Sequence, residues 1–212
     1  MQNSILFWTS VQQQIKFGKK TLTLKVLETD RLIIRRMSAN DSAFMLGLLN
    51  EPSWLRFIGN RGVRTIEDAQ NYILKGPVEM YARLGFGFCI VEMKVAGCPI
   101  GICGLAKRDY LDDVDIGFAL LPQYCGKGYA YESANAVLEY AKNELALKRV
   151  VATTRSGNHS SAKLLEKLGL RFERIIRHPD GNRELELFAI DIGKTMQRRL
   201  STPQCRTSTS FH

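Results

Sequence analysis

The stretch from Leu120 to Ala130 reads Leu-Leu-Pro-Gln-Tyr-Cys-Gly-Lys-Gly-Tyr-Ala and joins a strand-like segment to a long helical pattern. Its two glycines, Gly126 and Gly128, adopt positive φ without strain and carry no side chain that would block a ligand. Consecutive backbone N–H groups can therefore point into one concavity at the start of a helix, with the positive charge of Lys127 beside it. The spacing predicts a turn that binds phosphate groups.

Two common phosphate-binding motifs differ from this stretch in their spacing. A Walker A loop continues Gly-Lys with Ser or Thr, whereas Gly128 follows Lys127 here. The dinucleotide fingerprint has a small third residue where this chain has Tyr131. The pattern that matches is Gln-x-x-Gly-x-Gly, from Gln123 to Gly128, which resembles the pyrophosphate loop of the GCN5-related N-acetyltransferases (the GNAT superfamily), enzymes that bind acetyl-CoA.

Three further segments resemble the same superfamily, in the order in which the family carries them. Thr29–Arg35 is similar to the Thr-x-Arg-Leu-x-Leu-Arg opening strand of the branch that includes the ribosomal-protein alanine acetyltransferases (RimJ/RimL-like). Asp115–Leu120 is similar to its fourth strand, and Asn158–Leu170 to its Asn-x-x-Ser…Leu-Glu-Lys-Leu-Gly-Phe helix. The resemblance runs from Thr29 to about Ile192, so the chain is identified as a GNAT-like N-acetyltransferase.

The resemblance implies one α/β domain with a mixed, curved sheet of about six to seven strands flanked by helices, in which splayed fourth and fifth strands bind the cofactor. A length of 212 residues with 45% apolar residues suits one such domain. We assign residues 26–193 to it. Residues 1–25 form an N-terminal extension of uncertain order, and residues 194–212 form a basic, Ser/Thr-rich tail that we expect to be disordered.

The apolar periodicity predicts where the elements lie. Apolar residues recur at helical spacing after the glycine turn, and segment 149–154 is short and β-branched, as in a strand buried on both faces. We expect strands at 32–36, 87–93, 99–107, 114–121, 149–154 and in a hairpin around 179–182, and helices at 38–49, 65–82, 130–145 and 160–168.

The formal net charge of +9 resides in the two ends of the chain. Residues 1–25 and 194–212 hold eight basic and no acidic residues, which leaves 22 basic against 21 acidic residues between them. Contact of these ends with RNA, ribosomes or anionic lipid is one interpretation. We favour solvated ends, because neither shows the interleaved aromatic residues of nucleic-acid-binding surfaces.

The five cysteines form no C-x-x-C pair and have no paired histidines at ligand spacing, so we expect no metal site. Their odd number, in a chain whose start does not have the pattern of a secretory signal, fits a reducing, cytoplasmic compartment. No stretch approaches the roughly 20 consecutive apolar residues that a membrane span needs.

Direct transfer of an acetyl group from a thioester to an amine requires a neutral amine, a stabilised oxyanion and a protonated leaving thiolate. The resemblance places the pantetheine arm of acetyl-CoA along the fourth strand, where backbone groups of Phe118 and Leu120 pair with its amides. An N–H near Leu120 would polarise the thioester carbonyl. The cofactor-binding residues that the resemblance implies are Phe118, Leu120, Gln123, Cys125, Gly126, Lys127, Gly128, Tyr129, Ala130, Asn158 and Ser161.

Asp115 is the first candidate for the general base, directly or through a water. In a strand it shares a face with Gly117 and Ala119, whose small size leaves room for a thioester and an amine. The alternative is a salt-bridged strand residue. His159 is a further candidate, although a single loop histidine is more often a solvated one.

The acid for the leaving thiolate differs from that of the wider family. Many members carry a tyrosine on the helix after the fifth strand, where this chain has Leu164 and Leu165. The branch that it resembles carries a serine that matches Ser161, whose hydroxyl would bond the sulfur or relay a proton; a plain first-turn serine is the alternative. Asn158 is either a ligand of the cofactor amide or an ordinary N-cap. An acyl intermediate on Cys125 lacks a base partner, so we favour direct transfer.

The acceptor is a primary amine. It is either a protein N-terminus, as in the ribosomal-protein branch, or a small amine such as a polyamine, an amino acid or an aminoglycoside. Its pocket is expected from segment 54–81. Two rival functions stay open, a non-catalytic CoA-binding regulatory module and an RNA-associated protein that acts through its basic ends. We expect a monomer or a homodimer.

Overall fold

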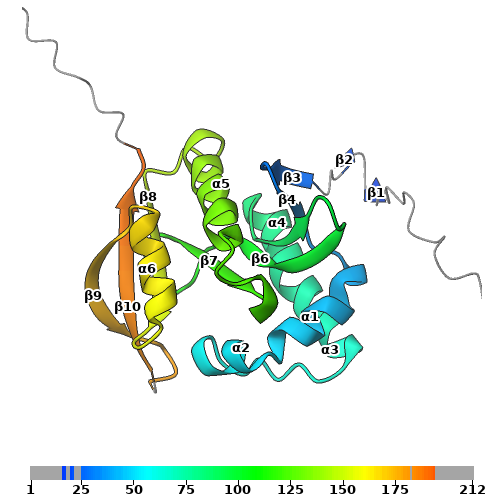
Figure 1. Ribbon diagram of the computed structural model, residues 1–212, viewed down its shortest axis with the longest axis horizontal. Coiled ribbons are helices and arrows are strands. Elements are labelled where there is room, and N and C mark those ends of the chain that lie inside the picture. The colour runs from blue at the N-terminus through cyan, green and yellow to red at the C-terminus, as the bar shows by residue number, and fades with distance from the viewer. Residues whose placement is uncertain (1–15, 18–19, 22–24, 182, 194–212) are drawn as a thin grey trace, which may run out of the picture.

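The computed structural model describes residues 16–17, 20–21, 25–181 and 183–193. Within these ranges eight strands form one sheet in the order β3-β4-β5-β6-β7-β8-β10-β9 (Figure 1). They are β3 (Lys25–Glu28), β4 (Leu32–Arg36), β5 (Phe88–Met93), β6 (Cys98–Ala106), β7 (Val114–Leu120), β8 (Arg149–Arg155), β9 (Arg171–Arg177) and β10 (Glu184–Asp191). A separate pair precedes them, β1 (Lys16–Phe17) and β2 (Lys20–Thr21). Neighbouring strands of the large sheet are antiparallel, except that β7 and β8 are parallel.

Within the described ranges, six α-helices connect the strands, and their ends follow local capping rules. They are α1 (Ser42–Leu49), α2 (Pro52–Phe57), α3 (Ile66–Ile73), α4 (Glu79–Leu84), α5 (Tyr129–Asn143) and α6 (His159–Lys167). Thr65 caps α3 and forms a capping box with Asp68. Gly85, with φ 80°, ends α4 in the left-handed region that favours glycine.

The predicted α/β domain is confirmed, with differences in detail. The sheet has one strand more than the expected six to seven, because β3 pairs with β4 just where the N-terminal extension was expected to end. The predicted helix 65–82 is α3 and α4 joined by a π turn, Leu74–Val78, in which Pro77 has no N–H to donate. Helix α2 was not predicted. Most of the predicted extension, and all of the tail at 194–212, lie outside the described residues.

Helices cover both faces of the sheet, and the sheet lies between two hydrophobic cores. On one face, α5 and α6 pack against residues such as Ile116 of β7, with Val137 of α5 in the same core (Figure 1). On the other face, α1, α2 and α3 form a core that includes Trp54 of α2 and reaches Ala119 of β7. Alternate residues of β7 therefore face different sets of helices, as the two-residue period of a strand requires.

The parallel pair in the centre of the sheet is short. β7 and β8 pair at Val114 with Val150 and at Asp115 with Val151. β7 continues to Leu120, but within the described residues it forms no further backbone pairs with β8. The strands therefore diverge, and the predicted splay of the fourth and fifth strands, which are β7 and β8, is confirmed.

Close approach of two strands makes Gly104 of β6 sensitive to substitution. A Cβ at this position would lie 2.3 Å from the carbonyl oxygen of Gly87 and 2.7 Å from Cα of Phe88. We expect Gly104→Ala to lower the free energy of unfolding by about 2 kcal/mol or more, because backbone atoms of β5 must move. Chemical denaturation measures this change.

Gly47→Ala is the matched control. Gly47 lies inside α1, and a Cβ there meets nothing within 4 Å. The same substitution should raise the free energy of unfolding by about 0.5–1 kcal/mol, because alanine loses less backbone entropy in a helix than glycine. Equal effects of the two variants would contradict the assigned β5–β6 packing.

Candidate active site

The predicted phosphate-binding loop has the expected backbone geometry. After the short turn Pro122–Tyr124, Gly126 and Gly128 have φ of 74° and 84°. Gly128 is the N-cap residue of the 15-residue helix α5, and no side chain caps that end among the described residues. The first-turn N–H groups of α5 are thus free to bind an anion.

The side chains of the loop divide between exposed and packed positions. Gln123, Cys125 and Lys127 are exposed, whereas Tyr129 is partly buried. The rings of Tyr124 and Tyr129 meet edge to face with centroids 6.5 Å apart, and Nζ of Lys127 lies 5.9 Å from the centroid of Tyr124. The two aromatic side chains therefore pack the loop from within, while its backbone stays accessible.

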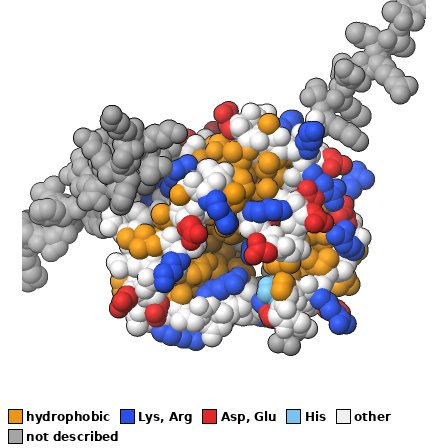
Figure 2. All heavy atoms as spheres, turned by 180° about the vertical axis from the view of Figure 1, so that it is seen from behind, with side chains coloured by type: hydrophobic (Ala, Val, Ile, Leu, Met, Phe, Trp, Pro, Cys, Tyr) orange, Lys and Arg blue, Asp and Glu red, His pale blue; other side chains and the backbone are white. Residues whose placement is uncertain are grey.

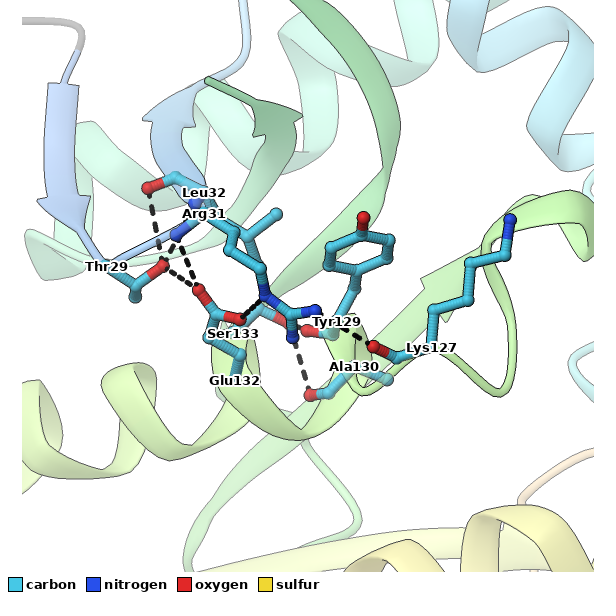
Figure 3. Close-up of polar contacts among 8 residues, drawn as sticks. All are labelled: Thr29, Arg31, Leu32, Lys127, Tyr129, Ala130, Glu132 and Ser133. Carbon is cyan, nitrogen blue, oxygen red and sulfur yellow. Dashed lines mark hydrogen bonds and ion pairs between the residues drawn. The ribbon is translucent and has the colours of Figure 1, made fainter. Parts of the chain in front are cut away.

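A carboxylate one turn into α5 connects the loop to the start of β4, as Figure 3 shows. Glu132 accepts a hydrogen bond at Oε1 from the Thr29 hydroxyl (2.5 Å) and from the Arg31 backbone N–H (2.9 Å), and at Oε2 from Nε of Arg31 (2.6 Å). Burial raises the pKa of Glu132, but these hydrogen bonds and the charge of Arg31 outweigh it, and the pKa is lowered. We call Thr29, Arg31 and Glu132 the loop clamp.

Arg31 also holds the loop itself. Its Nη1 donates to the carbonyl oxygen of Lys127 at 3.1 Å, and its guanidinium lies 4.5 Å from the ring centroid of Tyr129 (Figure 3). A Cβ at Gly128 would lie 3.2 Å from Nη2 of Arg31. The loop clamp therefore fixes the backbone of the loop and also neutralises Glu132, which would otherwise oppose an anion at the same helix end.

Sequence reasoning found Thr29 and Arg31 by resemblance but gave them no role, and it missed Glu132. The sequence did contain a signal for Glu132, which is an acidic residue in the first turn of the predicted phosphate-binding helix. A negative charge there opposes phosphate binding, so a basic partner is expected. The pairing partner, however, is about a hundred residues away in the chain, so spacing could not identify it.

The edge of β7 that faces β8 is open beyond Asp115. Leu121 donates its N–H to the carbonyl of Ile100 at 2.9 Å, in register with the β6–β7 ladder. Because hydrogen-bonding direction alternates along an antiparallel strand, the N–H and C=O groups of Phe118 and Leu120 point away from β6 and toward β8. These are the two residues that were predicted to pair with amides of the cofactor arm.

Asp115 lies at the closed end of this opening and is 2% exposed. Its Oδ2 accepts a hydrogen bond from Nε of Arg108 at 2.5 Å, and its Oδ1 is buried with no partner among the described residues. Burial raises the pKa of Asp115, while the charge and hydrogen bond of Arg108 and the backbone N–H of Thr153 act in the opposite direction. The space beside Gly117, expected to be free, is filled by Phe88, whose ring lies 2.9 Å from the position of a Cβ there.

The predicted residues at the start of α6 lie together across the opening. Oδ1 of Asn158 accepts the N–H of Ser161 at 3.3 Å, so Asn158 is the N-cap of α6. Its amide N–H groups have no recorded partner among the described residues. Ser161 is partly buried and His159 is exposed. Leu165, at the place of the family's tyrosine, is buried in the core.

Helix α2 crosses from the α1–α3 side to the far half of the sheet. Nη1 of Arg155, at the end of β8, donates to the carbonyl of Arg56 (2.5 Å), and Nη1 of Arg183 donates to the carbonyl of Ile58 (2.9 Å). Figure 2, the view from behind, shows a hollow floored by hydrophobic side chains, with charged side chains of both signs around it. Trp54 of α2 is 5% exposed, and its Nε1 has no partner among the described residues.

The described part of the chain contains no cluster of three or more His, Cys, Asp or Glu residues that could hold a metal ion, and no helix long and apolar enough to cross a membrane. Cys89, Cys98, Cys103 and Cys125 are free thiols.

The sequence matches one family over most of its length. Residues 31–171 match the family described as "Acetyltransferase (GNAT) domain". The chain is 30% identical over 158 residues to the uncharacterized N-acetyltransferase YnaD of Bacillus subtilis (strain 168), and the alignment covers 74% of this chain and 89% of YnaD.

Solved structures agree with this match. An acetyltransferase of the GNAT family from Bacillus anthracis is 26% identical and superposes with a TM-score of 0.65, covering 79% of this chain and 98% of that chain. RimL, a ribosomal L7/L12 α-N-protein acetyltransferase in complex with coenzyme A, is 15% identical and superposes with a TM-score of 0.66, covering 78% and 96%. The likeness to RimL concerns the fold alone.

Removing the charge of Arg31 should weaken binding of coenzyme A. We expect Arg31→Gln to lower the affinity about tenfold, or about 1.4 kcal/mol, because the loop loses its support and Glu132 is left unpaired beside the phosphates. Isothermal titration calorimetry measures the affinity. The same substitution at Arg171, an exposed residue of β9, should leave it unchanged.

The double variant Arg31→Gln/Glu132→Gln separates the two roles of Arg31. It should regain part of the lost affinity, because the unpaired carboxylate is then absent. If the double variant binds no better than Arg31→Gln, neutralisation of Glu132 is not how Arg31 acts.

Proposed function

This chain belongs to the GNAT family of acetyltransferases, and from that premise we propose that it moves an acetyl group from acetyl-CoA directly onto a primary amine in the cytoplasm. The observation that carries the proposal is the open edge of β7, which leads directly into an uncapped helix N-terminus. An extended arm with amide groups can complete that edge as an added strand would, while its phosphates bind at the helix end.

In the proposed complex the pyrophosphate lies at Gly126–Ala130, with Gln123, Cys125 and Lys127 at the mouth of the loop. The arm pairs with Phe118 and Leu120 and runs back along β7, which brings the thioester toward the end of the strand that holds Asp115. A backbone N–H of β7 in this stretch polarises the thioester carbonyl. Across the opening, the amide N–H groups of Asn158 reach the arm, and the Ser161 hydroxyl lies near the sulfur.

Asp115 serves as the general base in this proposal, through a water. Its raised pKa suits proton acceptance nearer to neutral pH, while Arg108 keeps the carboxyl ionised. The amine nitrogen attacks the thioester carbonyl, the C–S bond breaks, and the thiolate leaves as a thiol after a proton arrives by way of Ser161.

Direct transfer is favoured over an acyl-enzyme on Cys125. Burial raises the pKa of this thiol, and its recorded polar contacts are to the carbonyl oxygens of Leu120 and Leu121. Neither contact can remove its proton, so the thiol is a poor nucleophile.

The acceptor in this proposal is the N-terminus of a protein, as the name of RimL states for that protein, or a small amine. A turnover screen with peptides and small amines, in which release of free coenzyme A is followed, tests the function. Binding of acetyl-CoA without turnover of any acceptor would favour the regulatory module instead. The basic ends that an RNA-associated role requires lie mostly outside the described residues.

Asp115→Asn should lower kcat by about 10² to 10⁴, the contribution of a positioned general base, while the KM for acetyl-CoA changes little. Because burial raises the pKa of Asp115 above its usual 3.8, the acidic limb of the kcat/KM profile of the wild type should lie above that pH. This limb should be absent in the variant.

Asp109→Asn is the matched control, because Asp109 is exposed and close in sequence. It should keep the wild-type rate and profile. Near-complete activity of Asp115→Asn, with an unchanged profile, would assign Asp115 a structural role.

A further inference from the structure

The guanidinium of Arg108 has one nitrogen in use and two without partners. Its Nε donates to Asp115, and its Nη1 and Nη2 have no hydrogen-bond or ion-pair partner among the described residues. The side chain is 29% exposed, so this free edge is not sealed inside the core. Two parallel N–H groups of a guanidinium match the two oxygens of a carboxylate.

Two other half-buried arginines, Arg35 and Arg183, use all of their guanidinium nitrogens, whereas Arg36 and Arg155 each donate to one backbone carbonyl. Arg35 binds both Asp41 and Glu92, and Arg183 binds Asp180 as well as a backbone carbonyl. Burial of a cation is costly unless its hydrogen bonds are made. The free edge of Arg108 is therefore a place where a ligand can supply what the fold does not.

A second arginine acts on the same region as Arg108. Tyr72 of α3 is partly buried, and the two charges that act on its hydroxyl are those of Arg61 and Arg108. Arg61 is exposed and has no recorded ion pair among the described residues. The positive charges of Arg61 and Arg108 therefore both act on the Tyr72 hydroxyl on the α1–α3 side.

The same ion pair also offers an acceptor for a proton. Oδ1 of Asp115 is buried without a partner, and Oδ2 is bound to Arg108. The carboxylate of Asp115 and a free pair of donors on Arg108 thus lie on one joined unit. An amine that carries its own negative charge is complementary to both.

We propose that the acceptor is an amine with a carboxylate a few bonds away, as in an amino acid, whose carboxylate binds the Nη1/Nη2 edge of Arg108 while Asp115 takes up the proton of its amine. The inference rests on the proposed acetyl transfer and narrows its acceptor. It ranks such acceptors above polyamines and aminoglycosides, because a positive site repels a polycation.

The test compares matched acceptors. For one amino acid, its carboxamide and its decarboxylated amine, kcat/KM is measured with saturating acetyl-CoA, beside a peptide with an acidic first residue and a polyamine. We expect the wild type to prefer the amino acid over its carboxamide and its amine by about 10²-fold, because a site built for a charged group is left unpaired by the analogue. A preference for the peptide instead would place the carboxylate on a side chain and would still support the inference.

Arg108→Lys keeps the positive charge but not the planar pair of donors, and Arg108→Gln removes both. Each should reduce the preference for the carboxylate at least tenfold and leave the KM for acetyl-CoA unchanged. Arg174→Gln, an exposed position on β9, should keep the preference.

Several outcomes would overturn the inference. They are a wild type that acetylates the amine or the polyamine as well as the amino acid, or an unchanged preference in both Arg108 variants. If those variants do not fold, the acceptor ranking of the wild type alone still decides the matter. Binding of acetyl-CoA with no acetylation of any acceptor overturns the proposed function itself, and this inference with it.

Discussion

The structure depends on the parallel strands β7 and β8, which are hydrogen-bonded to each other at one end and separated at the other. β7 and β8 pair at two positions, through Asp115, and then separate within an otherwise antiparallel sheet. A strand edge with unpaired N–H and C=O groups is costly to bury unless something pairs with it. Here the opening lies between the helices of both faces, so the fold holds a vacant strand position in its own centre. We propose that the amide-bearing arm of acetyl-CoA occupies that position.

The carboxylates near the two ends of β7 differ in how their charges are compensated. At the loop end, Glu132 is neutralised by Arg31 and Thr29, which leaves the helix terminus positive toward an incoming phosphate. At the closed end, Asp115 is deeply buried and paired through one oxygen with Arg108. The first arrangement removes a charge that would oppose binding, and the second retains a charge that chemistry can use.

A half-satisfied buried ion pair is poor for stability alone. Burial of two charges costs several kcal/mol per ion, and the attraction offsets this only when the remaining hydrogen bonds are made. Asp115 and Arg108 each keep unfilled hydrogen-bonding positions toward the side of the sheet that carries α1, α2 and α3. Such unsatisfied groups are typical of sites whose partners arrive with the substrate.

Local physics was enough to predict most of the fold and one half of the site. The two glycines with positive φ, the N-cap of α3 at Thr65 and the hydrophobic period of α5 depend on neighbours in the chain, so the loop and most elements could be placed from the sequence. Helix α2 is six residues long and is held by arginines about a hundred residues away, so no local pattern indicated it.

Tertiary structure alone decided which charges meet. The pairing of Arg31 with Glu132 and the filling of the space beside Gly117 by Phe88 join segments that are distant in the sequence. The contact of Arg108 with Asp115 joins the loop after β6 to β7. The periodicity of a sequence predicts which face of its own helix or strand a side chain lies on. It does not predict which residue of a neighbouring element that side chain contacts. The backbone geometry of the loop could therefore be predicted from the sequence, whereas the arrangement of charges on the proposed acceptor side depends on how the sheet and helices bring these residues together.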